Sequence, residues 1–385
     1  MGEWREVALS EVADVTVGHV GSMTDQYRES GIPFLRSQNV RPHRIDLSDV
    51  KFIDLEFHQR LRKSALAPGD VVTVRTGKPG TSAVIPAAIP VANCADLVIT
   101  RPGPILDSRW LSYYLNFVID SHIGGLLVGA VQQHFNVQSA QKLKLPLPEI
   151  HEQRAIADVL SALDDKIAAN EKIAQTADEL GEALWAEAAS LGQSVPLNGL
   201  AKFVNGRAFT KGASGTGRVV VRIAELNSGI GPSTVYNDIE VADDHLARPG
   251  DLLFAWSGSL TVARWYRPEA IVNQHIFKVI PDTGYPLWFV NQVLRSKLEE
   301  FKAIASDKAT TMGHIQRRHL GEPVKIPLPG SSLDLYGVMD ALWEAALAAE
   351  IENLKLAETR DELLPLLMAG RIPIQAAVDK VEDAV

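Results

Sequence analysis

The sequence predicts an α+β protein in which two similar α/β domains are separated by two long helices that pair as an antiparallel coiled coil. Three observations carry this prediction. One long stretch repeats apolar side chains in heptads, and a second stretch with the same pattern follows 183 residues later. The segments in front of the two stretches also share short motifs in the same order. The chain therefore reads as an internal duplication with a pseudo-two-fold repeat.

The first long helix is predicted over residues 149–191. Pro146 and Pro148 precede it, and proline is tolerated at a helix start because its missing N–H group would have no partner there. Gly192 is a natural stop. A helix of about forty residues would be roughly 60 Å long, and its apolar stripe is too narrow for a core helix, so it requires a partner. Its seam positions alternate in steps of four and three: Ile156, Leu160, Leu163, Ile167, Asn170, Ala174, Ala177, Gly181 and Leu184.

The partner helix is predicted over residues 331–370 of the same chain. Residues 170–184 and 353–367 share eight of fifteen positions, and the motif LKLPLP at 143–148 returns as VKIPLP at 324–329. This second helix opens with Ser331-Ser332-Leu333-Asp334, which resembles a capping box, and stops near Gly370. Asn170 and Asn353 take equivalent seam positions, with Leu363 and Leu367 further along. Antiparallel pairing would place the two asparagines in the same or neighbouring layers, where a buried amide fixes register.

The remaining segments define domain 1 (residues 1–148), domain 2 (residues 192–330) and a C-terminal tail (residues 371–385). Pro68-Gly69-Asp70 before one apolar strand matches Pro249-Gly250-Asp251 before another, and Asn93 matches Asn273. Gly77 likewise matches Gly258. Both domains are predicted to consist of short strands broken by glycine and proline, followed by one helix.

Composition and charge exclude several classes of protein. Cys94 is the only cysteine, so an intramolecular disulfide and a cysteine-rich zinc site are excluded, and a cytoplasmic location is expected. The chain has no apolar run long enough to span a membrane, and its polar start is unlike a signal peptide. The net charge of −9 is concentrated in the helical segments. Residues 149–190 and 331–385 carry −7 each, whereas residues 1–148 carry +1 and residues 191–330 carry +4. A locally positive face on either domain is therefore compatible with the overall acidity.

A search for catalytic motifs gives one weak match. The sequence has neither the N/D-P-P-Y/F loop of DNA methyltransferases nor a phosphate-binding G-x-x-x-x-G-K-[ST] loop, and its ten histidines have no metal-ligand spacing. Asp282, followed by Glu300 and Lys302, resembles a nuclease motif, but that chemistry places the Glu and Lys on one face of a strand. Here the pattern around them is helical, which would turn the two side chains roughly 200° apart.

The helical motifs resemble those of the specificity subunits of type I restriction–modification enzymes. Glu152, Gln153, Ile156 and Ala157 after the proline entry are similar to the central conserved region of that family, and TRDELLPLLMAGRI is similar to its distal conserved region. QQHFNVQSAQKLKLPLP resembles the end of a target recognition domain. The second copy departs from the pattern because Ser331-Ser332-Leu333 stands where the first copy has Glu-Ile-His-Glu-Gln.

The resemblance implies a subunit without a catalytic site of its own. Domains 1 and 2 would be target recognition domains that each read one half of a bipartite site in double-stranded DNA. The paired helices would set the spacer and dock modification (methyltransferase) subunits, two of them, which restriction/translocase subunits would join. S-adenosylmethionine, ATP and Mg²⁺ are expected on the partner subunits and not on this chain. The alternatives are a nuclease or methyltransferase with an unrecognised site, the recognition subunit of a modification-only complex, and a helical scaffold that binds proteins only.

Candidate DNA contacts are polar or basic side chains near predicted strand ends, where loops reach base edges and phosphates. Each has an alternative as a solvated loop residue or a structural pair, and Trp256 and Trp265 are predicted more readily in the core than in base stacking. The candidates are Arg36, Gln38, Asn39, Arg75, Thr76, Lys78, Gln132, Gln133 and His134 in domain 1, and Arg222, Trp256, Ser257, Arg264, Thr310, Thr311 and His314 in domain 2. The candidate residues for helix pairing and partner docking are Glu152, Gln153, Ile156, Leu160, Leu163, Ile167, Asn170, Asn353, Leu363 and Leu367.

Overall fold

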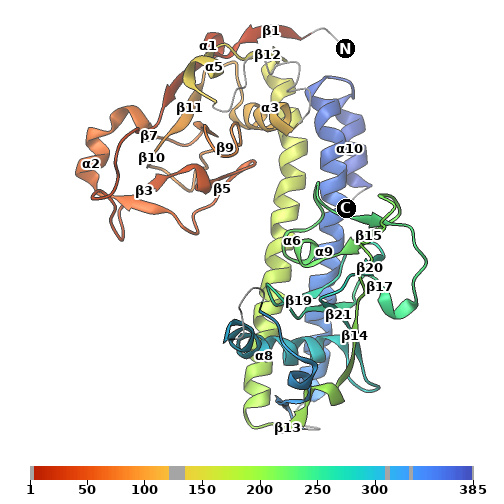
Figure 1. The fold of residues 1–385 in the computed structure, drawn as a ribbon. Coiled ribbons are helices and arrows are strands. Elements are labelled where there is room, and N and C mark those ends of the chain that lie inside the picture. Colours follow the sequence, from red (N-terminus) through yellow and green to blue (C-terminus); the bar gives the residue numbers. More distant parts are fainter. Residues whose placement is uncertain (1–3, 121–134, 308–312, 329–332, 384–385) are drawn as a thin grey trace. The chain divides into compact units, whose positions relative to one another are not determined.

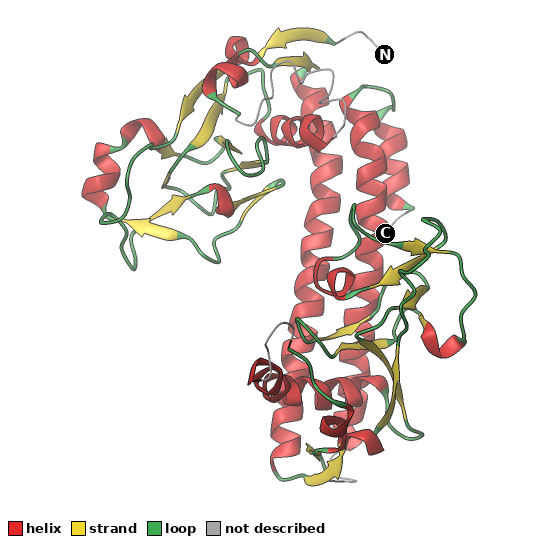
Figure 2. Ribbon diagram, viewed as in Figure 1, coloured by secondary structure: helices red, strands yellow, loops and turns green. Residues whose placement is uncertain are grey.

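The computed structural model describes residues 4–120, 135–307, 313–328 and 333–383 (Figure 1). The chain divides into two compact units. Unit 1 contains residues 1–165 and 356–385, and unit 2 contains residues 166–355. Each unit holds one α/β domain and part of both long helices, and along the chain a domain, a long helix, a second domain and a second long helix follow one another (Figure 2).

Domain 1 contains two four-stranded sheets and two two-stranded ones, one of which pairs β4 with β5. The first sheet has the order β2-β11-β8-β9, the second has the order β6-β3-β10-β7, and β1 pairs with β12 at the domain's entry and exit. The elements are β1 (Arg5–Ala8), α1 (Leu9–Val12), β2 (Ala13–Val17), β3 (Ile32–Leu35), β4 (Val40–Arg41), β5 (Arg44–Ile45), β6 (Lys51–Ile53), α2 (Leu55–Arg60), β7 (Ala65–Leu66), β8 (Val71–Val74), β9 (Ser82–Val84), β10 (Ala92–Cys94), β11 (Leu97–Pro102), α3 (Ser108–Asp120), α5 (Val137–Gln141) and β12 (Lys144–Leu147).

Domain 2 repeats this plan except for the β4–β5 pair, which has no counterpart among the described residues of domain 2. Its sheets have the orders β14-β21-β18-β19 and β16-β15-β20-β17, and β13 pairs with β22. In each domain the second sheet contains one parallel pair of strands, and the two pairs are equivalent: β3 with β10 in domain 1, and β15 with β20 in domain 2. The elements are β13 (Gln193–Pro196), β14 (Ala201–Asn205), β15 (Arg218–Val221), α7 (Ile223–Ser228), β16 (Tyr236–Asn237), β17 (Leu246–Ala247), β18 (Leu252–Ala255), β19 (Thr261–Arg264), β20 (Ala270–Val272), β21 (Ile276–Pro281), α8 (Leu287–Asp307) and β22 (Pro323–Ile326).

The Pro-Gly-Asp motif shows why the two domains fold alike. Gly69 has φ 91° and Gly250 has φ 96°, a left-handed conformation that glycine adopts without strain. In each turn the aspartate closes the loop, because Asp70 accepts a hydrogen bond from the Ala67 N–H group and Asp251 accepts one from the Arg248 N–H group. The following strands β8 and β18 are buried along their whole length. The predicted duplication is confirmed at the level of individual hydrogen bonds.

The two long helices are α6 (Ile150–Ser190) and α9 (Leu333–Met368). In unit 2 their alanines form a common cluster of Ala174 and Ala177 with Ala346 and Ala349. Asn170 donates to the Glu352 carboxylate at 2.6 Å, and a Cβ added at Gly181 would contact Met339, so residue numbers rise along α6 as they fall along α9. This is the predicted antiparallel pairing.

In unit 1 the remaining parts of the helices also pair. Arg360 of α9 donates to Asp164 of α6 at 2.8 Å. The seam side chains here are all nearly or fully buried: Ile156, Leu160, Leu163, Leu356, Leu363 and Leu367.

Both long helices end just before the glycines that the sequence identified as stops. A Cβ at Gly192 would lie 1.9 Å from the Ile326 carbonyl oxygen, so only glycine allows the chain to turn back beside β22. Gly370 has φ +60°, and the next residue, Arg371, donates its N–H group to the Leu366 carbonyl at 2.8 Å. The segment treated in the sequence as a tail contains a further helix, α10 (Ile374–Glu382), which starts directly after Pro373. Within the described ranges, no helix combines the length and the apolar character that a membrane span requires.

Candidate nucleic-acid interface

The β8–β9 loop is the most exposed candidate in domain 1. It closes tightly, since the Gly80 N–H group donates to the Val74 carbonyl at 2.7 Å, and Gly77 at its tip has φ 89°. Thr76 and Lys78 are exposed on either side of Gly77. Arg75 at the base of the loop forms an ion pair with Asp96. The loop thus presents a hydroxyl and an ammonium group to solvent, and both groups can contact a phosphate or a base edge.

A second candidate group surrounds Asp49. Arg36 donates to its main-chain carbonyl at 2.6 Å, Gln38 donates to its carboxylate at 2.6 Å, and Lys51 lies 3.4 Å away. Arg36 also donates to the Asp49 carboxylate at 3.2 Å, and this hydrogen bond and the charge of Lys51 lower the pKa of Asp49 below its ordinary value. Asn39 differs from its neighbours because it is 1% exposed. Its amide accepts from the Arg36 N–H group and donates to the Asp46 carbonyl, so its role is to hold the turn and it does not reach a base.

Arg222 occupies the position of Arg36 in the second copy, at the start of α7, but its guanidinium has internal partners. It donates to the buried Glu225 carboxylate through Nε at 3.0 Å and through Nη2 at 2.6 Å, and Nη2 also donates to the Ser233 carbonyl. Burial would raise the pKa of Glu225, but the hydrogen bonds from Arg222 outweigh burial and lower it. The geometry gives Arg222 a structural contact, so its prediction as a DNA contact has no support in this conformation.

The β18–β19 loop of domain 2 corresponds to the β8–β9 loop, and Gly258 has φ 63° there. Trp256 donates through Nε1 to Asn205 at 2.8 Å and packs against the domain core, while Trp265 is buried, so both tryptophans lie where the sequence predicts them. Ser257 is 2% exposed and pairs by its backbone with His314. The prediction that Ser257 reaches DNA directly is therefore not supported in this conformation. A cavity of about 530 Å³ adjoins the loop, and it is lined by Asn227, Gly258, Ser259, Leu260, Thr261, Lys302, Ala305, Ser306 and Gly313.

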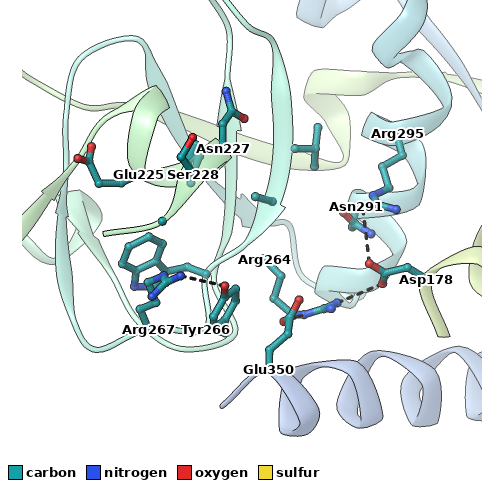
Figure 3. A pocket seen from close by; sticks show the side chains of 15 residues that line it. Asp178, Glu225, Asn227, Ser228, Arg264, Tyr266, Arg267, Asn291, Arg295 and Glu350 are labelled. Carbon is teal, nitrogen blue, oxygen red and sulfur yellow. Dashed lines mark hydrogen bonds and ion pairs between the residues drawn. The ribbon is translucent and has the colours of Figure 1, made fainter. Parts of the chain in front are cut away.

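Arg264 does not lie at a surface for DNA, which corrects the prediction. Its side chain is only 4% exposed and is held by Glu350 at 2.8 Å and by Asp178 at 3.5 Å. The guanidinium also lies over the Trp343 ring, 4.5 Å from its centroid. Figure 3 shows Arg264, Glu350 and Asp178 converging beside a cavity of about 410 Å³. Arg264 therefore attaches domain 2 to the paired helices.

Five of the predicted DNA contacts lie outside the described residues: Gln132, Gln133, His134, Thr310 and Thr311.

The docking candidates on the helices divide into two groups. Gln153 is fully buried and bonds to the Asp107 N–H group and to the Ile105 and Pro148 carbonyls, so it attaches domain 1 to α6 and is not available to a partner. Glu152 accepts a hydrogen bond from the Trp4 indole at 3.2 Å. The others lie in the helix seam as predicted: Ile156, Leu160, Leu163, Ile167, Asn170, Asn353, Leu363 and Leu367.

The two asparagines are both in the seam, but they do not bond to each other. Asn170 is 1% exposed and donates to Glu352, whereas Asn353 donates to the Ile167 carbonyl at 3.1 Å. The Oδ1 atom of Asn353 is buried without a partner. Burial raises the pKa of Glu352, but the hydrogen bonds from Asn170 and Lys166 outweigh it, and the net pKa is lowered.

Two further side chains that attach domain 1 to the paired helices carry no signal in the sequence. Tyr113 of α3 donates to Asp164 at 2.6 Å, and His43 stacks on the Tyr113 ring with centroids 4.2 Å apart. Burial lowers the pKa of His43 to about 4, so its imidazole is neutral at physiological pH. No local motif marks these side chains, because their role depends on contacts between segments far apart in the chain.

The nuclease-like match at Glu300 and Lys302 lies in a helix and not in a strand. Glu300 and Lys302 lie in α8, and each pairs with another residue of the same helix, Lys297 and Glu299 respectively. Phe301 between them is fully buried, which fixes the two charged side chains on the flanks of the helix. Among the residues that the structure describes, no group of three or more His, Cys, Asp or Glu side chains could hold a metal ion.

Known proteins with similar sequences and structures are specificity subunits of type I restriction–modification systems. A specificity subunit of the type I restriction enzyme MjaVIII from Methanocaldococcus jannaschii is 25% identical over 177 residues. This match covers 43% of the chain and only 40% of the relative's length. The crystal structure of a type I restriction–modification system S subunit from M. genitalium is 14% identical, with a TM-score of 0.61 over 94% of this chain and 96% of that chain, and therefore shares the fold. Residues 1–178 match the model of the type I restriction modification DNA specificity domain. The resemblance seen in the sequence is thereby confirmed for residues 1–178, which contain domain 1 and the first part of α6 and match the type I restriction modification DNA specificity domain.

Proposed function

We propose that the chain is the DNA sequence-specificity subunit of a type I restriction–modification enzyme. One observation carries the proposal beyond the family match of residues 1–178. Domains 1 and 2 have the same strand order and the same closing hydrogen bonds, yet their equivalent loops present different side chains. A duplicated scaffold with different loop chemistry is what a protein needs to read two different half-sites of one bipartite DNA sequence.

Double-stranded DNA is the proposed ligand of both domains. In domain 1, Thr76 and Lys78 would contact it from the β8–β9 loop, and Arg36 and Gln38 would do so from the group around Asp49. Phosphate contacts of this kind position a protein on DNA, and contacts to base edges supply sequence specificity. Domain 2 would use the β18–β19 loop, where Lys302 lines the adjoining cavity.

The paired helices would dock the modification subunits. In unit 2 the seam residues Ala177 and Ala349 are each followed by a carboxylate, Asp178 and Glu350, to which Arg264 of domain 2 attaches. The residues that precede seam positions lie on the opposite side of an antiparallel pair, and there large apolar side chains are exposed. This exposed stripe consists of Ile173 (48% exposed), Leu180 (46%) and Val338 (43%).

A stripe of this kind on a helix pair suits partner helices, which would bury it. Because the chain is a duplication, two modification subunits would bind, and restriction/translocase subunits would join them. The reaction chemistry would belong to these partners: S-adenosylmethionine for methyl transfer, and ATP with Mg²⁺ for translocation. The specificity subunit would then contribute recognition and geometry without a catalytic site of its own.

Methylation mapping tests the proposal directly. The full chain is expressed with its modification subunit in a host that lacks other methyltransferases, and methylated sites are read from its genome. We expect one bipartite motif with a fixed spacer. A variant in which another recognition domain replaces residues 1–148 should change one half-site only. Methylation by the chain without any partner would instead favour an enzyme, and a change of both half-sites together would contradict independent reading.

A modification-only complex is distinguished by a second measurement in the same host. Reduced plating of phage with unmodified DNA requires a restriction subunit, whereas methylation alone does not.

A further inference from the structure

The same place in both domains holds a residue in a backbone conformation that side chains disfavour. Asp96, directly before β11, has φ 45°, and His275, directly before β21, has φ 73°. Only one other non-glycine residue in the described ranges, His43, has a positive φ. Strain at a non-glycine residue persists where the surroundings enforce it, and it clusters at functional sites. Its presence at the equivalent position of both copies indicates a feature that belongs to the shared function.

Each strained residue contacts the residue that ends the neighbouring strand. Asp96 forms an ion pair with Arg75, which follows β8, and the His275 ring lies 5.2 Å from the ring of Trp256, which follows β18. The backbone around the two pairs is the same. The Arg75 carbonyl accepts from the Phe135 N–H group at 3.2 Å, and the Trp256 carbonyl accepts from the Ile315 N–H group at 3.1 Å. The scaffold is thus constant while the side chains differ.

Both positions also contain buried polar atoms without a partner. In the described part of the chain seven buried side-chain nitrogen or oxygen atoms lack a hydrogen bond, and three of them lie here: Nε of Arg75, Nδ1 of His275 and Oγ of Ser257. The internal Arg264, by contrast, uses its Nε to donate to Glu350. Unpaired buried polar groups are uncommon in native proteins and call for a specific cause, such as a ligand that supplies the missing partner.

We propose that Arg75, oriented by Asp96, reads a guanine in the half-site of domain 1. The inference rests on the proposed function. Nη1 donates one of its two N–H groups to Asp96, so its other N–H group and those of Nη2 stay available at the end of the side chain. Two parallel donors match the O6 and N7 acceptors that guanine presents in the major groove. The carboxylate holds the guanidinium in one rotamer, which reduces the entropy lost on binding.

Domain 2 has no guanidinium at the equivalent place. Trp256 packs against the domain core and Ser257 is buried, and the His275 imidazole cannot make the two-pronged contact of an arginine with guanine. The two half-sites therefore differ at the base that this position faces.

The test is methylation mapping of the full chain with its modification subunit, carrying Arg75→Ala. We expect the motif to lose its requirement for guanine at one position of one half-site, with discrimination against the other bases reduced about 10-fold or more, while the other half-site stays unchanged. Asp96→Asn should relax the same position less strongly. The matched control is Arg28→Ala, which removes a surface arginine of the same domain that pairs with Asp54 at 2.9 Å and should leave the motif intact.

Retention of the guanine by Arg75→Ala overturns the inference. So does a uniform fall in methylation with an unchanged motif, which would mark a phosphate contact. If Arg75→Ala does not fold, as judged by its thermal unfolding, Arg75→Lys keeps the charge and the stem without the fork and should relax the same position. If the wild-type chain itself yields no bipartite motif, the proposed function fails. If the wild type yields one and the Arg75 variants leave it unaltered, only this inference fails.

Discussion

Replacement of Arg264 by methionine should destabilise domain 2 through the carboxylates that it leaves behind. The guanidinium is 4% exposed and bridges Glu350 and Asp178 while it covers the Trp343 ring. Methionine preserves much of the volume, so the loss arises mainly from charge. Removal of one partner of a buried ion pair typically costs about 3–5 kcal/mol. The two carboxylates keep 24% and 29% exposure, which places the expected loss in the free energy of unfolding at about 3 kcal/mol, the lower end of that range.

This loss should depend on pH with a definite sign. Burial raises the pKa of Glu350 above its ordinary value, and Arg264 opposes that rise, so the pKa increases further in the variant. A carboxyl whose pKa is higher in the folded state favours folding when it is protonated, and this contribution is lost as pH rises through the folded-state pKa. The deficit of the variant relative to wild type should therefore be largest near pH 7.5 and smaller near pH 5.

Urea unfolding of the full chain at the two pH values measures both quantities. At a slope of about 3 kcal/mol per M, the loss at pH 7.5 corresponds to a midpoint roughly 1 M lower. Arg264→Met combined with Glu350→Gln should recover part of it, because the buried charge is removed. Arg248→Met is the control, since this surface arginine pairs with exposed carboxylates and its loss should leave the midpoint unchanged. An equal deficit at both pH values, or a double variant no more stable than the single one, would refute the reasoning.

Three further predictions concern the helices. Leucine at both Asn170 and Asn353 should raise the melting temperature in calorimetry, because the Oδ1 atom of Asn353 is buried without a partner; an unchanged or lower value would count against this. Gln153→Leu should lower the free energy of unfolding by about 2 kcal/mol in urea titration, because the Asp107 N–H group and two carbonyls lose their partner. A variant as stable as the wild type would contradict the role of Gln153 in attaching domain 1 to α6. One heptad inserted after Asn170 and another after Asn353 lengthen each helix by about 10 Å. Methylation mapping should then show a spacer longer by about three base pairs, with both half-sites kept. An unchanged spacer would mean that the helices do not set the distance between the half-sites.

The sequence predicted the elements whose signals are periodic or repeated. The first long helix was expected over residues 149–191 and spans Ile150–Ser190, because a heptad pattern with a proline entry and a glycine stop is a local property of the chain. The equivalence of Pro68-Gly69-Asp70 and Pro249-Gly250-Asp251 was visible for the same reason. In each copy the turn requires the same glycine conformation and the same aspartate acceptor.

The side-chain roles were harder to predict because they depend on what the folded chain places nearby. Arg264 is the last residue of a strand, as a DNA-reading arginine also could be, and only the approach of Glu350 and Asp178 makes it an internal anchor. Gln153 belongs to a family motif, which favoured a docking role, but its side-chain amide forms hydrogen bonds with domain 1. Asp96 and His275 carry no motif, since a strained φ is a property of the assembled sheet.

Unit 1 is built from two separate stretches of the chain, and this has a consequence for how the protein folds during synthesis. Unit 2 is one continuous stretch, residues 166–355, whereas unit 1 combines residues 1–165 with residues 356–385. On the ribosome, Asp164 of α6 emerges 196 residues before Arg360 of α9, which is its partner in the folded chain. At about 5–20 residues per second this interval lasts roughly 10–40 s, during which Leu160 and Leu163 lack their final neighbours. Unit 2 can therefore complete first, and a chain that ends before residue 356 would leave this apolar segment open to aggregation.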